Sequence, residues 1–219
     1  MATVVSPQQD GSQVLIPEWI IDNTSFLRWA VSDDAPSRGK IGYFQHQVWI
    51  DQTMETAFHN CIKSEIAFAV TLWARQHNLG HYFVDGMMFS CPEADLSTEP
   101  DGMFVLNGSK ASGKVWLEKG KHSSVLFGVP DMVLEVVSKS SKKKDFETLL
   151  ESYHQAGISE YWLVNSLVSK PALCIYQHNA KEYAAVQSQS GWVRSEVLGA
   201  SFRLTVDQST DQVLVECQP

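Results

Sequence analysis

The sequence predicts an α/β protein of α+β character, with helices flanking a mixed central β-sheet. Three observations lead to this prediction: an amphipathic helical pattern at 56–77, two strand-like apolar runs at 102–106 and 132–137, and a second helical pattern followed by a strand at 161–164. The 219 residues are 44% apolar, which suffices for one sizeable core. We therefore expect an irregular N-terminal segment, 1–40, and a single domain, 41–219.

The first residues mix Ser, Gln, Gly and Asp without periodicity, and the run Pro36-Ser37-Arg38-Gly39 indicates a loop. The N-terminus lacks the basic start and apolar block of a secretion signal. The longest apolar stretch, 66–74, is shorter than the ~20 residues that cross a membrane. We therefore expect a cytoplasmic protein with no membrane partner.

The helix at 56–77 is predicted because its apolar residues recur every three or four positions. They are Phe58, Ile62, Ile66, Ala69 and Trp73. After this helix, segments 82–84 and 87–89 flank the turn dipeptide Asp85-Gly86 and predict a β-hairpin.

The runs 102–106 and 132–137 are predicted to be central strands that pair antiparallel through the long connection between them. A helix carrying Phe146, Leu149, Leu150 and Tyr153 on one face should end at Gly157, where a left-handed cap is easily formed. Short strands should follow at 161–164, 173–176, 183–186 and 192–197.

The formal net charge of −8 opposes tight binding to nucleic acid, which depends on Lys and Arg neutralising phosphates. Two local clusters of lysine residues, by contrast, favour binding to nucleic acid. One comprises Lys139, Lys142, Lys143 and Lys144, and the other comprises Lys110, Lys114, Lys119 and Lys121. These lysines are typical of solvated loops, and they would also suit a basic rim that approaches DNA.

Residues 129–165 read VPDMVLEVVSKSSKKKDFETLLESYHQAGISEYWLVN. This stretch resembles the Uma-type restriction endonuclease family, a branch of the PD-(D/E)XK nuclease superfamily. The shared features are a Pro-Asp strand with Glu four residues after the Asp, a basic loop, a helix and the run E-Y-W-L-V. Glu99-Pro100-Asp101 is similar to the family's other Pro-Asp element, and the resemblance covers roughly 45–200. It implies a restriction-endonuclease-like fold that hydrolyses DNA phosphodiesters with Mg²⁺ or Mn²⁺.

Asp101 and Glu135 are the first candidates for metal ligands, because antiparallel pairing of the two strands brings them together. Asp131 lies ~13 Å along the strand from Glu135, so it is a catalytic candidate of second rank, which could bind a second ion, fix a loop or act only structurally. Glu65 faces the apolar side of the first helix and is a third candidate metal ligand. His59 and His154 are interpreted as packing or surface residues.

The superfamily lysine is missing from both positions where the resemblance predicts it, because Val137 and Leu149 stand there. Lys139 is the favoured replacement, since it lies farther along the strand of Glu135 on the same face. Lys142 or Lys144 could instead fold back from the loop.

Two functions remain open from the sequence. The first is a metal-dependent DNA endonuclease, impaired to some degree by the loss of the usual lysine. The alternative is a non-catalytic descendant of the fold that binds nucleic acid or a protein, with a homodimer as one possibility. The target sequence and the oligomeric state cannot be read from the chain.

Overall fold

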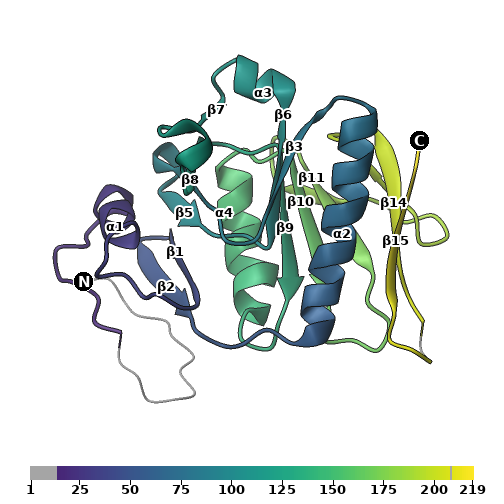
Figure 1. Ribbon diagram of the computed structural model, residues 1–219, viewed down its shortest axis with the longest axis horizontal. Coiled ribbons are helices and arrows are strands. Elements are labelled where there is room, and N and C mark those ends of the chain that lie inside the picture. The colour runs from purple at the N-terminus through teal and green to yellow at the C-terminus, as the bar shows by residue number, and fades with distance from the viewer. Residues whose placement is uncertain (1–13, 208) are drawn as a thin grey trace.

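A computed structural model describes residues 14–207 and 209–219 (Figure 1). The helical elements are α1 (Asn23–Ala30), α2 (Ala57–Gln76), α3 (Asn107–Ala111), α4 (Leu149–Gln155), the 3₁₀ turns Pro92–Ala94 and Gly120–His122, and a π-helical turn at Lys144–Thr148. The strands are β1 (Lys40–Phe44), β2 (Gln47–Asp51), β3 (Gly80–Val84), β4 (Met88–Cys91), β5 (Leu96–Thr98), β6 (Gly102–Leu106), β7 (Val115–Trp116), β8 (Val125–Gly128), β9 (Met132–Val137), β10 (Glu160–Asn165), β11 (Leu173–His178), β12 (Tyr183–Ala185), β13 (Val193–Ser195), β14 (Ala200–Val206) and β15 (Val213–Gln218).

The central sheet has the order β12-β11-β10-β9-β6-β3. It is mixed, because β9 and β10 are parallel while the other neighbours are antiparallel. The parallel pair requires a crossover, which the π-helical turn and α4 provide. β6 pairs antiparallel with β9, as the sequence predicts, and the register places Gly102 opposite Leu134.

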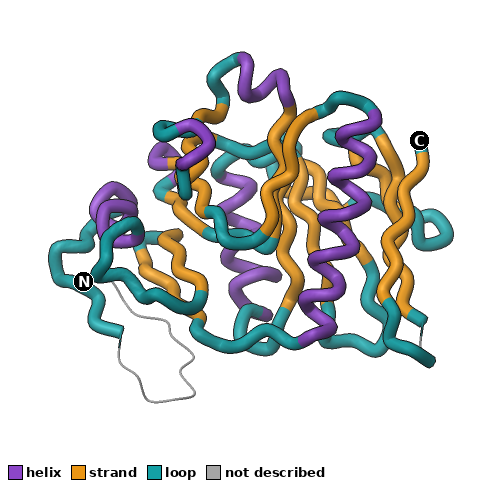
Figure 2. The backbone as a smooth tube through the Cα atoms, viewed as in Figure 1, coloured by secondary structure: helices purple, strands orange, loops and turns teal. Residues whose placement is uncertain are grey.

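The two faces of the central sheet are covered by different elements (Figures 1 and 2). Met132, Leu134 and Val136 of β9 pack in a cluster with α2 and the small sheet β13-β14-β15. Val133 and Val137 pack on the opposite face, with α4 and a second large sheet. Burial on both faces explains why β9 reads as an almost continuous apolar run.

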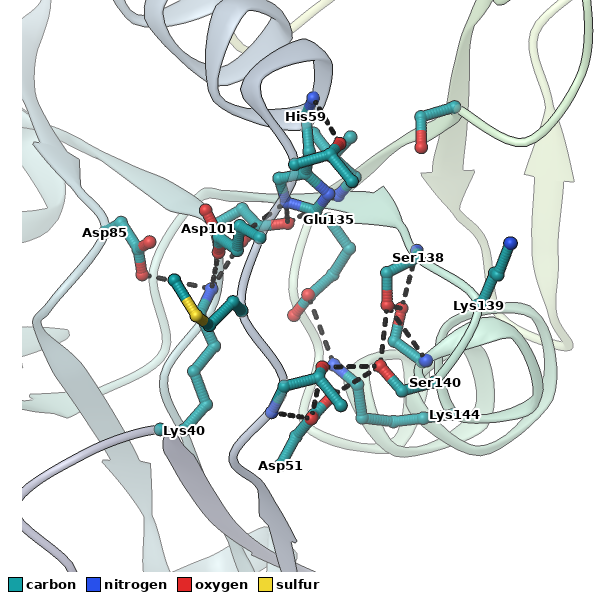
Figure 3. Close-up of a pocket in the computed structure, with 18 of the residues that line it drawn as sticks. Lys40, Asp51, His59, Asp85, Asp101, Glu135, Ser138, Lys139, Ser140 and Lys144 are labelled. Atoms are coloured by element: carbon teal, nitrogen blue, oxygen red, sulfur yellow. Dashed lines mark hydrogen bonds and ion pairs between the residues drawn. The ribbon is translucent and has the colours of Figure 1, made fainter. Parts of the chain in front are cut away.

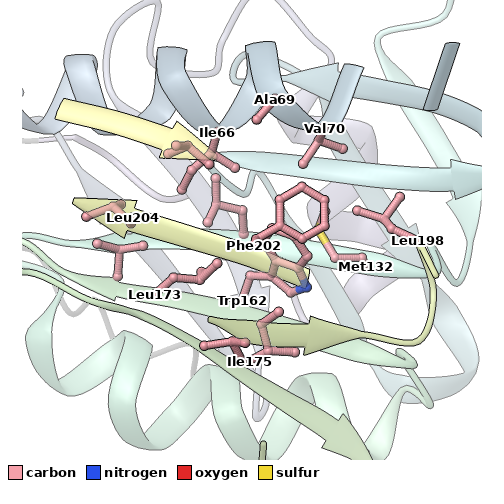
Figure 4. Close-up of a cluster of buried hydrophobic side chains, with 14 of the residues drawn as sticks. Ile66, Ala69, Val70, Met132, Trp162, Leu173, Ile175, Leu198, Phe202 and Leu204 are labelled. Atoms are coloured by element: carbon pink, nitrogen blue, oxygen red, sulfur yellow. The ribbon is translucent and has the colours of Figure 1, made fainter. Parts of the chain in front are cut away.

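The core on the α2 side centres on Trp162, whose ring meets that of Phe202 edge-on with centroids 4.9 Å apart (Figure 4). The Trp162 indole N–H donates to Glu160 Oε2. The same buried carboxylate accepts from Ser195 Oγ and from the backbone N–H groups of Glu196 and Val197. These bonds attach the small sheet to the central one.

The second large sheet, of order β2-β1-β5-β4-β8-β7, corrects two expectations. Residues 1–13 lie outside the described residues, but α1 lies within the segment expected to be irregular, where Asp22 and Ser25 form a reciprocal capping box. Eight residues make only about two helical turns, too few for a clear apolar period in the sequence. The helix packs on the second sheet through Phe26 and Trp29.

The hairpin predicted around Asp85-Gly86 is also wrong, because β3 pairs with β6 and β4 pairs with β5 and β8. A tight type I′ turn needs two residues with positive φ, and only Gly86 has one, at 93°. The corresponding turn instead joins β1 and β2, where Gln45 and His46 have φ of 51° and 58°.

The predicted helices and the fold class are confirmed. Thr56 caps α2 by accepting from the His59 backbone N–H. α4 ends before Gly157, whose φ is 78° and whose N–H donates to His154 O. No helix among the described residues is long and apolar enough to span a membrane.

Candidate active site

A cavity of about 1150 Å³ opens where β6 begins and β9 ends. Its walls come from the start of β1, the segment from β2 to α2, the first turn of α2, and the loop after β9 (Figure 3). Elements from both large sheets therefore meet at this cavity. Of the residues that the sequence singles out, the cavity is lined by Asp101, Glu135 and Lys139, by Lys144, the alternative to Lys139, and by His59, which was interpreted as a packing or surface residue.

Asp101 immediately precedes β6, and Glu135 lies on the neighbouring strand β9, so the two approach each other as predicted. The register Gly102↔Leu134 continues to place Asp101 opposite Glu135. Both residues are buried, with 4% and 2% of their surfaces exposed. Asp101 Oδ2 accepts a hydrogen bond of 2.6 Å from the Val136 N–H, which ties the first carboxylate to the strand of the second.

Glu135 lies between a lysine and a tyrosine. Its Oε2 is 3.3 Å from Lys144 Nζ, and its Oε1 accepts a hydrogen bond of 2.7 Å from Tyr153 O–H. Burial raises the pKa of Glu135 to about 8, and the negative charges of Asp145 and Asp101 act in the same direction, whereas Lys144 opposes them. A carboxyl poised near neutrality is typical of functional sites.

The lysine beside this carboxylate is Lys144, and not Lys139, which the sequence favoured. Lys139 is exposed and contributes to the rim, while Lys144 is 7% exposed. Lys144 Nζ also lies 2.8 Å from Asp145 Oδ1 and 4.7 Å from the centre of the Trp49 ring. Burial acts to lower the pKa of Lys144, but Asp145 and Glu135 raise it above its usual value.

Lys144 is the first residue of the π-helical turn. Such turns change the phase of a helix and are frequent at functional sites. Asp145, the second residue of the turn, is fully buried and accepts from Ser141 Oγ. The loop before it is fixed by Ser140, which donates to Asp51 Oδ2 at 2.7 Å. Val137 and Leu149, where lysine was expected, are buried in the apolar cluster.

Asp101 has a second set of neighbours that the sequence analysis missed. Lys40 Nζ contacts Asp101 Oδ1 and lies 3.0 Å from Asp85 Oδ1. Lys63 Nζ contacts Glu55 and Asp85 and lies 3.8 Å from Asp101 Oδ1. Burial would raise the pKa of Asp101, but contacts with His59 and Lys40 hold it well below its usual range.

Glu55, His59 and Asp101 form a group that could hold a metal ion, because one ligand atom from each lies within 4.8 Å of the others. His59 Nε2 is 3.4 Å from Asp101 Oδ2 and 3.7 Å from Glu55 Oε1. The interpretation of His59 as a packing residue missed this arrangement. Its spacing of three before Ile62 places it on the buried face of α2, and a histidine there was the available sign.

Glu65 and Asp131 do not line the cavity. Glu65 lies six residues after His59 on α2, which is ~9 Å farther along the helix axis. Asp131, at the opposite end of β9, accepts from the Leu106 N–H, Ser109 Oγ and Lys114 Nζ at 2.7–2.9 Å. The structure thus joins Asp101 and Glu135, and it leaves the other two carboxylates outside the site.

Three comparisons with known proteins complete the description. The model of the Uma2 family, described as "Putative restriction endonuclease", matches residues 24–207. One similar solved structure is the crystal structure of "a putative nuclease belonging to DUF820" from Anabaena variabilis ATCC 29413. Its TM-score is 0.62 at 17% identity, and the alignment covers 82% of this chain and 91% of the other. This likeness shows the same fold. Among curated proteins, none matches.

Proposed function

This chain belongs to the Uma2 restriction endonuclease family, and we propose that it is a divalent-metal-dependent endonuclease that hydrolyses DNA phosphodiester bonds. The observation that carries the proposal is the meeting of Asp101, Glu135 and Lys144 at one cavity. Two carboxylates from adjacent strands and one ammonium group are the elements that metal-assisted phosphodiester hydrolysis requires.

The donor set fits a divalent cation. Carboxylate oxygens are the ligands that Mg²⁺ and Mn²⁺ prefer, and Asp101 and Glu135 would supply them. The cation, when bound, would neutralise phosphate charge and make water a better nucleophile. His59 Nε2 makes no hydrogen bond among the described residues, which also suits a site that gains a partner on binding.

The chain's own residues have distinct parts in this proposal. Lys144 would orient the attacking water and offset the charge that develops on the phosphate oxygens, since its ammonium already faces Glu135. Tyr153 would hold Glu135 in place through its hydrogen bond. Exposed Lys139, Lys142 and Lys143, in the loop that borders the cavity, would contact the DNA backbone.

The alternative, a descendant that binds without cleaving, is favoured by one observation. Three acidic groups at the cavity are already paired with lysines: Asp101 with Lys40, Glu55 with Lys63, and Glu135 with Lys144. Those pairs compensate charge without a metal. In this alternative the exposed lysines would retain nucleic acid or a protein partner, a second copy of the chain included.

A plasmid-nicking assay separates the two functions. Supercoiled DNA is incubated with the full chain in Mg²⁺ or Mn²⁺, beside Glu135→Gln and the matched control Glu65→Gln, an acidic residue outside the cavity. The endonuclease predicts nicking by the wild type and the control, and its loss in Glu135→Gln. Absence of metal-dependent nicking by the wild type, or nicking that survives Glu135→Gln, would refute it.

A further inference from the structure

His59 is a buried imidazole whose free nitrogen faces two carboxylates. Only 5% of the residue is exposed, and Nε2 makes no hydrogen bond among the described residues. An unsatisfied buried polar atom costs free energy, and native proteins keep few of them. Nε2 nonetheless points to Asp101 Oδ2 at 3.4 Å and Glu55 Oε1 at 3.7 Å. This position of Nε2 would suit a nitrogen that coordinates a metal cation.

The spacing of the three ligand atoms fits a single ion. Ligands each about 2.1 Å from a common metal lie about 3–4 Å apart, according to their angle at the ion. The ligand atoms of Glu55, His59 and Asp101 all lie within 4.8 Å of one another. Small side-chain adjustments would therefore bring them to coordination distance.

The chemistry of the set indicates which cation it would take. Mg²⁺ prefers oxygen ligands and keeps several waters, whereas imidazole nitrogen suits first-row transition ions, whose affinities rise from Mn²⁺ through Co²⁺ to Cu²⁺. We propose that Glu55, His59 and Asp101 form a site for a first-row transition dication, and that His59 discriminates against Mg²⁺. The inference rests on the proposed function only in assigning the metal to the same cavity, and it adds Glu55 and His59 as ligands.

The charged groups around this triad include more carboxylates than ammonium groups. Glu55, Asp85 and Asp101 converge on the ammonium groups of Lys40 and Lys63. Three carboxylates face two ammonium groups, so a net negative charge remains when His59 is neutral. A transition dication would enter by displacing an ammonium group from Asp101 and Glu55.

The test measures metal binding without DNA, so it does not depend on cleavage. The full chain, stripped with a chelator, is titrated with Co²⁺ and separately with Mg²⁺ by calorimetry, and the Co²⁺ visible absorption is recorded. The variants are His59→Gln and Glu55→Gln. The matched control is His178→Gln, which removes an exposed imidazole that stacks on His154 4.2 Å away and could bind Co²⁺ adventitiously.

The expected result is one Co²⁺ site that binds more tightly than Mg²⁺. His59→Gln and Glu55→Gln should each lower the affinity for Co²⁺ by more than about tenfold. Loss of a residue that merely orients a metal ligand already lowers metal affinity by about 10–100-fold. Mg²⁺ affinity should change less in His59→Gln, and His178→Gln should bind as the wild type. Circular dichroism checks folding, and the more exposed Glu55 gives a second test should His59→Gln fail to fold.

The inference is overturned if the wild type binds no Co²⁺, or if folded His59→Gln and Glu55→Gln bind it as the wild type does. Loss of Co²⁺ binding only in His178→Gln would place the ion at the stacked histidines and would overturn it equally. The proposed nuclease function is read from plasmid nicking. If the wild type nicks DNA with Mg²⁺ but binds no Co²⁺, only this metal-site inference is refuted. If it binds Co²⁺ through His59 but does not nick DNA, only the nuclease proposal is refuted.

Discussion

Lys144 Nζ lies 3.3 Å from Glu135 Oε2, with both side chains buried at the end of β9. The lysine is the first residue of the π-helical turn that follows the loop after β9, and it immediately precedes Asp145. An ammonium group is therefore present at the carboxylate although both positions that the family resemblance indicates are apolar. This contact is the basis of the first prediction.

Replacing Lys144 by Met should lower metal-dependent nicking by about 10²–10³-fold, because a charge that acts on the developing phosphate charge is lost from a water-poor site. Lys139→Met, the matched control, removes an exposed lysine from the rim and should cost only a few-fold through weaker DNA binding. Rates are compared at saturating DNA. Equal losses in the two variants would show that Lys144 acts only as one of several DNA-binding lysines.

Glu135 should make stability depend on pH. Its pKa rises from about 4.5 in the unfolded chain to about 8 in the folded protein. The stabilisation from its protonated form is therefore complete below pH 4.5 and is lost as the pH rises to 8. Between pH 5 and 8 the wild type should lose more free energy of unfolding in urea than Glu135→Gln, by at least about 1 kcal/mol, since each pKa unit corresponds to about 1.36 kcal/mol. Parallel curves for the two proteins would contradict the raised pKa.

Asp131 should contribute to the stability of the fold and not to metal binding. Its carboxylate accepts three hydrogen bonds that join β9 to α3 and the end of β6, and it is 3% exposed. Asp131→Ala should cost about 1–3 kcal/mol of unfolding free energy, because the partly buried Leu106 N–H and Ser109 hydroxyl lose their acceptor. Exposed Asp33→Ala should cost almost nothing. A stable Asp131→Ala protein with weakened metal binding would instead return Asp131 to the site.

The elements predicted correctly are those whose pattern is local. The stripe from Phe58 to Trp73 defines α2, and the apolar runs of β6 and β9 define two strands whose pairing brings Asp101 to Glu135. Both strands are buried and strongly apolar, which indicated that they are central and could pair with each other through the long connection between them. The dipeptide Asp85-Gly86 predicted the wrong strand pairing, because turn residues report only on the local chain. β4 pairs with β8, in a different sheet from β3.

The rest of the site depends on contacts distant in sequence. Lys40 reaches Asp101 across 61 residues and Lys63 reaches Asp85 across 22, so no spacing rule connects them. Lys144 was an open alternative to Lys139, because strand alternation cannot describe a loop that ends in a π-helical turn. Glu65 was chosen over His59 because a carboxylate was expected on α2, although the cavity lies at the first turn of that helix.

Lys40→Met should strengthen metal binding. The ammonium of Lys40 contacts Asp101 and lies 3.0 Å from Asp85 and 3.7 Å from Glu55, so it competes with a dication for the same oxygens. Removing one positive charge within 4 Å of the ligands should raise Co²⁺ affinity by about tenfold or more, given about 4 kcal/mol for such a charge pair at an effective dielectric constant of 20, reduced by reorganisation. Calorimetry gives the affinity, and Lys114→Met, which unpairs Asp131, is the control. Unchanged or weaker Co²⁺ binding in folded Lys40→Met would mean that Lys40 supports the site.

The last prediction concerns Leu149, one turn before Tyr153 on α4. Tyr153 donates to Glu135 at 2.7 Å, and residues four apart share a helix face, so a long side chain at 149 extends toward the same carboxylate. Leu149→Lys in the Lys144→Met background should therefore raise nicking by about tenfold or more over Lys144→Met alone. Burying the new ammonium should also lower stability, because its desolvation is only partly offset by Glu135.

The matched control is Leu150→Lys in the same background, which presents its ammonium about 100° around the helix and is only partly buried. Addition of Glu135→Ala to the Lys144→Met/Leu149→Lys protein should abolish the recovered nicking. If the Lys144→Met/Leu149→Lys protein is folded, as judged by circular dichroism, but recovers no nicking activity, a lysine at position 149 cannot replace Lys144 beside Glu135. If Leu150→Lys recovers as much nicking activity as Leu149→Lys, the gain is a general effect of added positive charge on DNA binding. The proposal that a lysine must lie beside Glu135 would then be refuted.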